Sequence, residues 1–185
     1  MVDPSHLRIQ LYPAEVLRIK AARVEPTDEV RAVGRRMLEL MRGAEGIGLA
    51  GPQVGLSWRI FVCDVPADPE EERWADTDPP SATVGPQVWL NPEIVGSDRG
   101  VVAYSEGCLS LPGITGDVNR PATVTMRATT PEGDTVRVSA TGLLARCWQH
   151  EIDHLDGVLI LDRMTQTSRL KNRSRVKAME KAGRR

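Results

Sequence analysis

Aromatic residues are scarce in this chain of 185 residues, which has one Phe, two Tyr and four Trp. Surfaces that stack nucleic-acid bases depend on such rings, so we do not expect a DNA-binding protein. The chain also lacks an apolar run long enough to span a membrane, and it shows no signal peptide. These absences predict a protein of the cytoplasm that has neither a membrane nor DNA as its partner.

Cysteine and histidine are equally sparse, with three residues of each type. An odd number of cysteines without a secretory signal argues against a disulfide framework. The glycine-rich stretch Gly46–Gln53 is not followed by Gly-Lys-Ser/Thr, so it is not a phosphate-binding loop. With 41% hydrophobic residues and a net charge of −1, the chain is expected to form one domain with a substantial core.

Two of the three histidines stand four residues apart in the sequence His150-Glu151-Ile152-Asp153-His154. Apolar residues at helical spacing surround this motif, and Asp156-Gly157 follows as a stop signal, which predicts a helix. Histidines at i and i+4 project from one side of a helix and can share a metal ion, while Glu151 can reach a water on that metal. The alternative is a pair of hydrogen-bonded histidines in the core.

A catalytic metal site takes three protein ligands, so a third ligand is needed. The position where metzincins place a third histidine is Ile160, and the glutamate about twenty residues downstream is Glu180, in a basic segment. Cys63 lies in an apolar strand-like run, and Cys147 lies too far along the same helix as the histidines. Cys108 is therefore the best remaining ligand, against the alternative of a free cysteine in a loop.

Gly46 and Gly48 can bring backbone close to a ligand, and Gln53 supplies an uncharged amide donor. Such a donor can stabilise the oxyanion that forms when hydroxide attacks a carbonyl. The alternative is an ordinary loop with a surface glutamine.

Three motifs in this order resemble the peptide deformylase family. They are Gly46–Gln53 for G-x-G-x-A-A-x-Q, Glu106–Ser110 for E-G-C-L-S and Gln149–His154 for Q-H-E-x-D-H. The second and third match in full, and the first departs at Gly51, where alanine is usual. The similarity extends over about residues 7–164.

The resemblance implies a metal-dependent hydrolase that removes the formyl group from the N-terminal formyl-methionine of new polypeptides and releases formate. Cys108, His150 and His154 would be the metal ligands and Glu151 the proton carrier. The family favours Fe²⁺, and a thiolate with two imidazoles also suits Zn²⁺, Ni²⁺ or Co²⁺.

Substrate contacts are also implied by the resemblance. Gln53 and the backbone N–H of Leu109 would receive the formyl oxygen. Backbone groups of Ile47 and Gly48 would hold the peptide in an extended form, and Leu143 with Cys147 would line the methionine pocket. An ion pair between Glu106 and Arg120 would support the site.

The expected fold is α+β: a small single domain with mixed or antiparallel sheets around the central helix that carries the metal-binding motif. A first helix should run from a cap at Thr27 to about Met41. Strands are expected near 59–65, 87–95, 101–105, 118–129 and 135–140. The acidic, proline-rich segment 66–86 reads as a solvated loop within a catalytic domain of residues 1–168.

Residues 169–185 form a basic C-terminal tail with net charge +7. Arg169, Arg173, Lys177 and Lys181 follow each other at i+4 intervals, so a helical tail would carry a basic stripe. This stripe predicts a contact with ribosomal RNA phosphates, against the alternative of a solvated or disordered end.

Two other functions fit parts of the sequence. A metallopeptidase would use the same His-Glu-His helix, but its usual third ligand is missing. A non-catalytic module that binds a structural metal and RNA would need a fourth protein ligand and would have no use for Glu151 or Gln53.

Overall fold

Every strand pairing in the described chain is antiparallel, and the strands form two sheets. The computed structural model describes residues 2–67 and 77–183. One sheet has the order β1-β2-β3-β6-β7, and the other contains β4 and β5. The strands are β1 (Gly48–Ala50), β2 (Ile60–Cys63), β3 (Gln87–Ser97), β4 (Val101–Gly107), β5 (Thr115–Pro121), β6 (Thr123–Thr129) and β7 (Thr135–Thr141). The predicted α+β class with antiparallel sheets is confirmed.

The helices precede β1 or follow β7, apart from η3, which lies between β1 and β2. The α-helices are α1 (Asp28–Gly43), α2 (Gly142–Leu155), α3 (Ile160–Arg163) and α4 (Gln166–Gly183), and the short 3-10 helices are η1 (Pro4–His6), η2 (Glu15–Arg18) and η3 (Gly51–Val54). Helix α1 begins where Thr27 was expected to cap it, because the Thr27 hydroxyl accepts a hydrogen bond from the backbone N–H of Val30.

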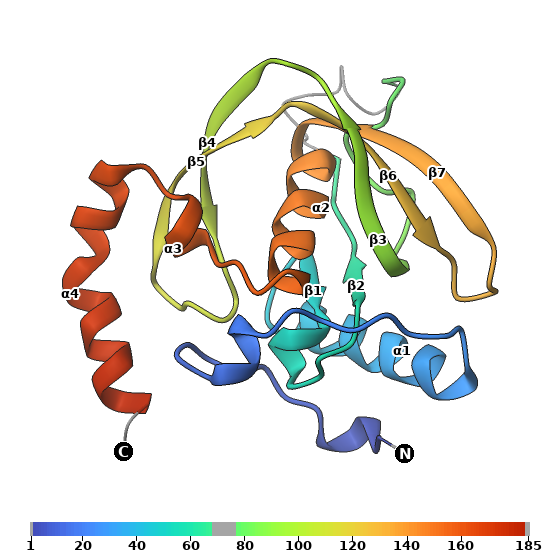
Figure 1. Ribbon diagram of the computed structural model, residues 1–185, viewed down its shortest axis with the longest axis horizontal. Coiled ribbons are helices and arrows are strands. Elements are labelled where there is room, and N and C mark those ends of the chain that lie inside the picture. The colour runs from blue at the N-terminus through green and yellow to red at the C-terminus, as the bar shows by residue number, and fades with distance from the viewer. Residues whose placement is uncertain (1, 68–76, 184–185) are drawn as a thin grey trace.

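Helix α2 lies between the two sheets, with β4 and β5 on one side and the five-stranded sheet on the other (Figure 1). It ends in a Schellman motif, in which Gly157 N–H donates to His154 O and Val158 N–H donates to Asp153 O. Gly157 has φ +73°, and a Cβ there would lie 2.6 Å from the carbonyl oxygen of Arg18. A glycine is therefore needed where the motif-bearing helix stops.

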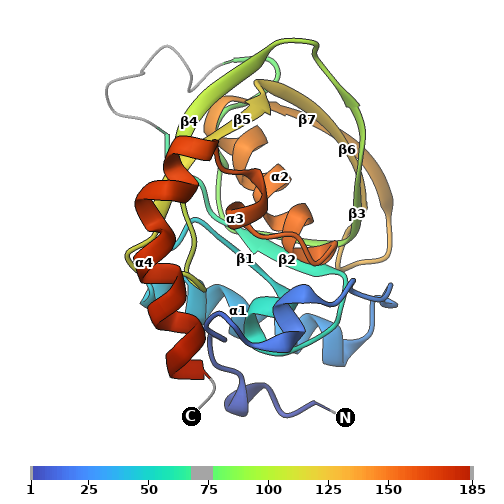
Figure 2. The same ribbon diagram turned by 60° about the vertical axis from the view of Figure 1, so that its left-hand side comes forward.

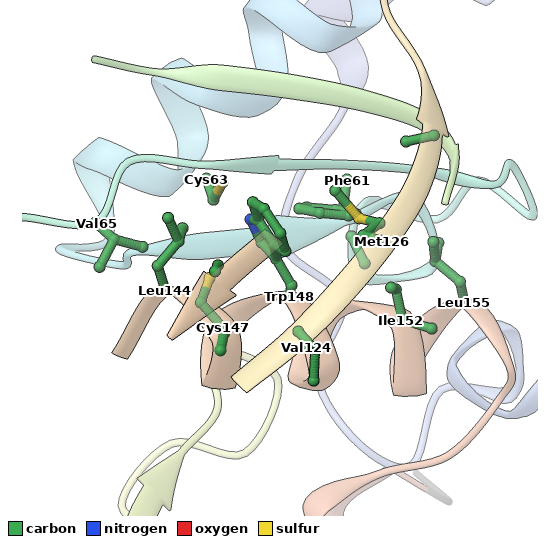
Figure 3. Close-up of a cluster of buried hydrophobic side chains, with 14 of the residues drawn as sticks. Phe61, Cys63, Val65, Val124, Met126, Leu144, Cys147, Trp148, Ile152 and Leu155 are labelled. Carbon is green, nitrogen blue, oxygen red and sulfur yellow. The ribbon is translucent and has the colours of Figure 1, made fainter. Parts of the chain in front are cut away.

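Apolar side chains fill both faces of the five-stranded sheet near β2. Phe61 and Cys63 point toward α2, where Trp148 packs beside them (Figure 3). Ile60 and Val62 alternate with these residues and pack on the other face, against α1. Because β2 is buried on both faces, the sheet holds α2 at a fixed distance from α1.

One predicted strand is wrong. Residues 118–129 form the end of β5 and all of β6, and these strands belong to different sheets. The chain changes sheets at Ala122, between Pro121 and Thr123. The β-branched residues Val118 and Thr123 stand on either side of this point with no glycine between them, so periodicity alone does not reveal the change. Strand β1 was not predicted, and residues 68–76 of the predicted acidic loop lie outside the described residues.

Helix α4 lies along the outer side of β4 and β5 (Figures 1 and 2). Its Ser168 hydroxyl accepts the Asp117 N–H at 3.0 Å, and its Asn172 amide donates to Thr115 O at 2.7 Å. Near the other end, the Tyr12 hydroxyl donates to Glu180 at 2.8 Å. The boundary expected between residues 168 and 169 thus falls inside a helix that packs on the rest of the chain.

Candidate metal centre

Three side chains from two elements bring one sulfur and two nitrogens together. Cys108 follows the last residue of β4, and His150 and His154 lie on successive turns of α2. The Cys108 sulfur lies 3.2 Å from His154 Nε2, which in turn lies 3.2 Å from His150 Nε2. The three ligand atoms are all within 4.8 Å of one another. The two histidines that the sequence alone identified by their i, i+4 spacing therefore face the predicted cysteine.

The donor set and its surroundings fit a divalent metal. One thiolate and two imidazoles suit Zn²⁺, Fe²⁺, Co²⁺ or Ni²⁺, and three protein ligands leave a position for water, as in catalytic sites. His154 is 1% exposed, and its Nδ1 atom has no hydrogen-bond partner within the described part of the chain. Hydrogen bonds alone cannot satisfy the Cys108 sulfur and both Nε2 atoms at these distances, because an imidazole nitrogen either donates or accepts. A single metal ion can bind all three atoms.

Glu106 binds the His150 ring at Nδ1, on the side away from the other ligand atoms. Its Oε2 atom lies 3.0 Å from His150 Nδ1, so the opposite ring nitrogen faces Cys108. Arg120 makes a bidentate ion pair with Glu106 at 2.6 and 2.9 Å, which confirms the predicted pair. Burial alone would raise the pKa of the Glu106 carboxyl, but hydrogen bonds from His150 and Arg120 lower it well below its usual range. The group is therefore a permanent anion.

Glu151 lies beside the ligands but does not join them. It is 3% exposed, and its Oε2 atom has no hydrogen-bond partner among residues 2–67 and 77–183. Burial raises the pKa of this carboxyl to about 7. A Cβ on Gly48 would lie 2.4 Å from Glu151 Oε1 and 2.8 Å from the Cys147 sulfur. The bare backbone of Gly48 thus makes room for a carboxyl that can exchange protons near neutral pH.

Gln53 points its amide donors at the site. Its Oε1 atom accepts the Ala50 N–H at 2.8 Å, which fixes the orientation of the amide. The Nε2 atom then lies 3.5 Å from the Cys108 sulfur and 3.3 Å from the Ser110 hydroxyl. At 1% exposure, Gln53 is a buried donor rather than a surface residue.

A cavity of about 440 Å³ opens next to these groups. Cys108, His150, Glu151 and Gln53 form its polar part. The residues expected to contact substrate also line it, namely Ile47, Gly48, Leu109, Leu143 and Cys147. The structure therefore gathers every predicted site residue around one cavity or in the ligand cluster beside it.

The glycine at position 51 has a local explanation. A Cβ at Gly51 would lie 2.4 Å from the carbonyl oxygen of Trp58 and 3.2 Å from that of Leu56. The chain after η3 therefore passes closer to Gly51 than an alanine would allow. The departure from the family motif leaves Gln53 in place, because the Ala50 N–H still fixes its amide.

Sequence analysis missed two charged residues of the site. Arg146 donates to Glu106 at 2.7 Å and lines the cavity, and its guanidinium lies 5.3 Å from the ring centroid of Tyr104. Asp153 accepts hydrogen bonds from Arg120 and Arg163, each at 2.7 Å. One signal was available: Arg146 precedes His150 by four residues, so it lies on the ligand side of a largely apolar helix.

None of the helices in the described ranges is long and apolar enough to cross a membrane.

Known proteins resemble this chain over most of its length. The family model for polypeptide deformylase matches residues 6–170. A peptide deformylase of Picosynechococcus is 39% identical over 176 residues, which cover 92% of this chain and 88% of the relative. One from Caulobacter vibrioides is 40% identical over 156 residues, covering 84% of this chain and 83% of the relative.

Solved structures show the same fold. The peptide deformylase of Thermotoga maritima superposes with a TM-score of 0.75 at 36% identity, covering 86% of this chain and 97% of that one. The Synechococcus elongatus enzyme, solved with actinonin, gives a TM-score of 0.79 at 38% identity, covering 99% and 90%. The chain therefore belongs to the peptide deformylase family, whose members are metal-dependent enzymes that remove the N-terminal formyl group from nascent peptides.

Proposed function

We propose that Cys108, His150 and His154 hold the catalytic metal of this deformylase, Fe²⁺ in the cell, with Zn²⁺, Ni²⁺ or Co²⁺ able to replace it. The observation that carries the proposal is the convergence of the Cys108 sulfur and the two Nε2 atoms within 4.8 Å. When bound, the ion supplies Lewis acidity, which makes hydroxide available near neutral pH. Substrate hydrolysis then adds the elements of water across the formyl C–N bond and releases formate and a free amine.

Glu151 moves the proton in this scheme. Its unpartnered Oε2 atom is a buried acceptor, and its carboxyl borders the same cavity as Cys108 and His150. We assign it two transfers: it takes a proton from the attacking water and delivers that proton to the departing nitrogen. A carboxyl whose pKa lies near 7 can do both at physiological pH.

Gln53 and the backbone N–H of Leu109 receive the formyl oxygen as it gains negative charge. The Gln53 amide is buried, and its hydrogen bond with Ala50 fixes its orientation. The amide therefore needs little reorganisation when the oxyanion forms. Leu109 directly follows the ligand Cys108 and lines the cavity. Removing one donor of this kind typically costs about 3 kcal/mol of transition-state stabilisation.

The apolar part of the cavity takes the methionine side chain. Leu143 and Cys147 lie on one side of α2 one turn apart, and both line the cavity. Ile47 and Gly48 line the same cavity beside Cys147, and their backbone groups hold the peptide in an extended form by β-type hydrogen bonds.

One assay tests the proposed function against its two alternatives. Formate release is measured from formyl-Met-Ala-Ser beside the unformylated peptide, together with the metal content of the chain. We expect formate release, no internal cleavage of the unformylated peptide and one ion per chain. Cleavage of the unformylated peptide would indicate a metallopeptidase. A tightly bound ion without either activity would indicate a non-catalytic module.

The basic C-terminal segment supports a ribosome contact. Arg173, Lys177 and Lys181 are exposed on α4, one turn apart, while Ser168 and Asn172 face the body of the protein. This division leaves the cationic side of the helix free to approach RNA phosphates. We propose residues 1–168 as the catalytic part, the segment 169–185 as the ribosome-facing part, and the cytoplasm, where nascent chains emerge, as the place of action.

A further inference from the structure

Arg146 joins the two elements that supply the metal ligands. It belongs to α2, one turn before His150, and it is 8% exposed. Its Nη2 atom donates to the carbonyl oxygen of Val102 in β4 at 2.7 Å, and its Nη1 atom donates to that of Val118 in β5 at 3.1 Å. One guanidinium therefore binds backbone on both strands of the two-stranded sheet.

The same guanidinium completes the hydrogen bonds of Glu106. A carboxylate has about four acceptor positions. Arg120 occupies one on each oxygen, His150 Nδ1 occupies a second on Oε2, and Arg146 Nη1 occupies a second on Oε1 at 2.7 Å. With all positions filled, the Glu106 carboxylate cannot turn away from the His150 ring without breaking a charge-assisted bond.

We infer that Arg146 is a positioning residue for the metal centre. It fixes the separation between Cys108, which follows β4, and His150 on α2, because it binds both elements directly and also orients the carboxylate that holds the imidazole. Arg120 makes the reciprocal connection, from β5 to Asp153 of α2. The inference rests on the proposed ligand set.

A second arginine provides a matched control. Arg59 also binds a carboxylate, Asp156, at 2.8 Å, and it also donates to backbone carbonyls, those of Pro92 and Leu155. Its side chain is 12% exposed, but within the described residues the Asp156 carboxylate makes no hydrogen bond to either histidine ring. A loss caused only by removing a largely buried arginine should therefore appear equally in Arg59→Met and Arg146→Met.

The test uses the full chain and measures Zn²⁺ dissociation constants by competition with a chelator. We expect Arg146→Met to raise the Zn²⁺ dissociation constant about 10- to 100-fold, as loss of a group behind a metal ligand commonly does. With the enzyme metal-saturated, kcat should fall while KM for formyl-Met-Ala-Ser stays within about threefold. Arg146→Lys, which keeps one charged donor, should recover part of the affinity, and Arg59→Met should bind Zn²⁺ like the wild type.

The alternative outcomes are distinct. A wild-type chain that binds no Zn²⁺ would contradict the proposed ligand set itself. Wild-type affinity in Arg146→Met, an equal loss in Arg59→Met, or a change in KM alone would overturn the inference and leave the ligand set standing. If Arg146→Met does not fold, Arg146→Gln replaces it, and an unchanged dissociation constant together with an unchanged Co²⁺ absorption spectrum overturns the inference in the same way.

Discussion

Helix α2 presents two sides that are held in different ways. Toward the five-stranded sheet, Trp148 is buried among apolar neighbours such as Phe61, and its ring makes an edge contact with Trp89 at 6.2 Å between centroids. Toward β4 and β5, Arg146 is buried among charged groups around Glu106. On the first side the Trp148 Nε1 atom has no hydrogen-bond partner in the described part of the chain, whereas on the second Arg146 donates hydrogen bonds to Glu106 and to backbone carbonyls of β4 and β5.

The two sides of α2 therefore contribute differently to the stability of the fold and to the geometry of the metal centre. Hydrophobic burial is non-directional and scales with area, so the apolar side holds α2 in the fold but specifies ring orientations poorly. Charge-assisted hydrogen bonds have narrow distance and angle ranges, so the other side sets where the His150 and Cys108 atoms lie. Substitutions on the two sides should therefore give different phenotypes.

The largest effect is expected at Cys108. Cys108→Ser removes the thiolate ligand, so metal binding should weaken sharply and activity with the native metal should be lost. Cys63→Ser is the matched control, because Cys63 is buried in the core near α2 and lies outside the cluster of Cys108, His150 and His154. It should lower the free energy of unfolding without changing metal content. Equal metal retention by the two variants would contradict the ligand assignment.

Glu151→Gln should cause the next largest loss, and in turnover alone. The amide keeps the size of the side chain but cannot accept the proton, so kcat should fall about 10²- to 10⁴-fold. Metal content should stay at the wild-type level, because Glu151 is not among the three converging ligands. Near-native turnover at full metal occupancy would show that another group carries the proton.

Trp148→Ala tests the apolar side. Truncating a buried tryptophan typically lowers the free energy of unfolding by about 3–5 kcal/mol, and denaturant titration would measure it. Well below the unfolding transition, Zn²⁺ affinity should remain near that of the wild type. Leu170→Ala on α4, where the side chain is 70% exposed, should change stability by less than about 0.5 kcal/mol. Loss of Zn²⁺ affinity in folded Trp148→Ala would remove the distinction between the two sides.

The smallest effect on chemistry is expected outside both sides of α2. Substituting Arg173, Lys177 and Lys181 together by Glu should leave formate release from a short peptide unchanged, while co-sedimentation with ribosomes should weaken and lose part of its salt dependence. Charge substitution is sharper than truncation, because α4 also covers the backbone of β5. The control is the same change at three exposed arginines elsewhere, Arg23, Arg35 and Arg99. Equal ribosome binding by both variants would make the stripe an ordinary solvated face.

The sequence predicted the three converging side chains better than it predicted the charged network that positions them. His150 and His154 are fixed by helical periodicity, which is local, and Cys108 emerged by elimination among few cysteines. The network around Glu106 joins residues 40 and 44 positions away, Arg146 and His150, and depends on which strands meet α2. The error at residues 118–129 has the same origin, because strand propensity does not say which sheet a strand joins.

Gly48 gives part of the substrate cavity a wall without a side chain. Because a Cβ there would lie within 3 Å of Glu151 and Cys147, any other amino acid displaces one of these two side chains. A substitution at Gly48 therefore requires one of these side chains to move, whereas Leu143 can be exchanged for a side chain of similar volume. A point mutation at Gly48 that weakens a ligand bound to its backbone would therefore also disturb the site itself.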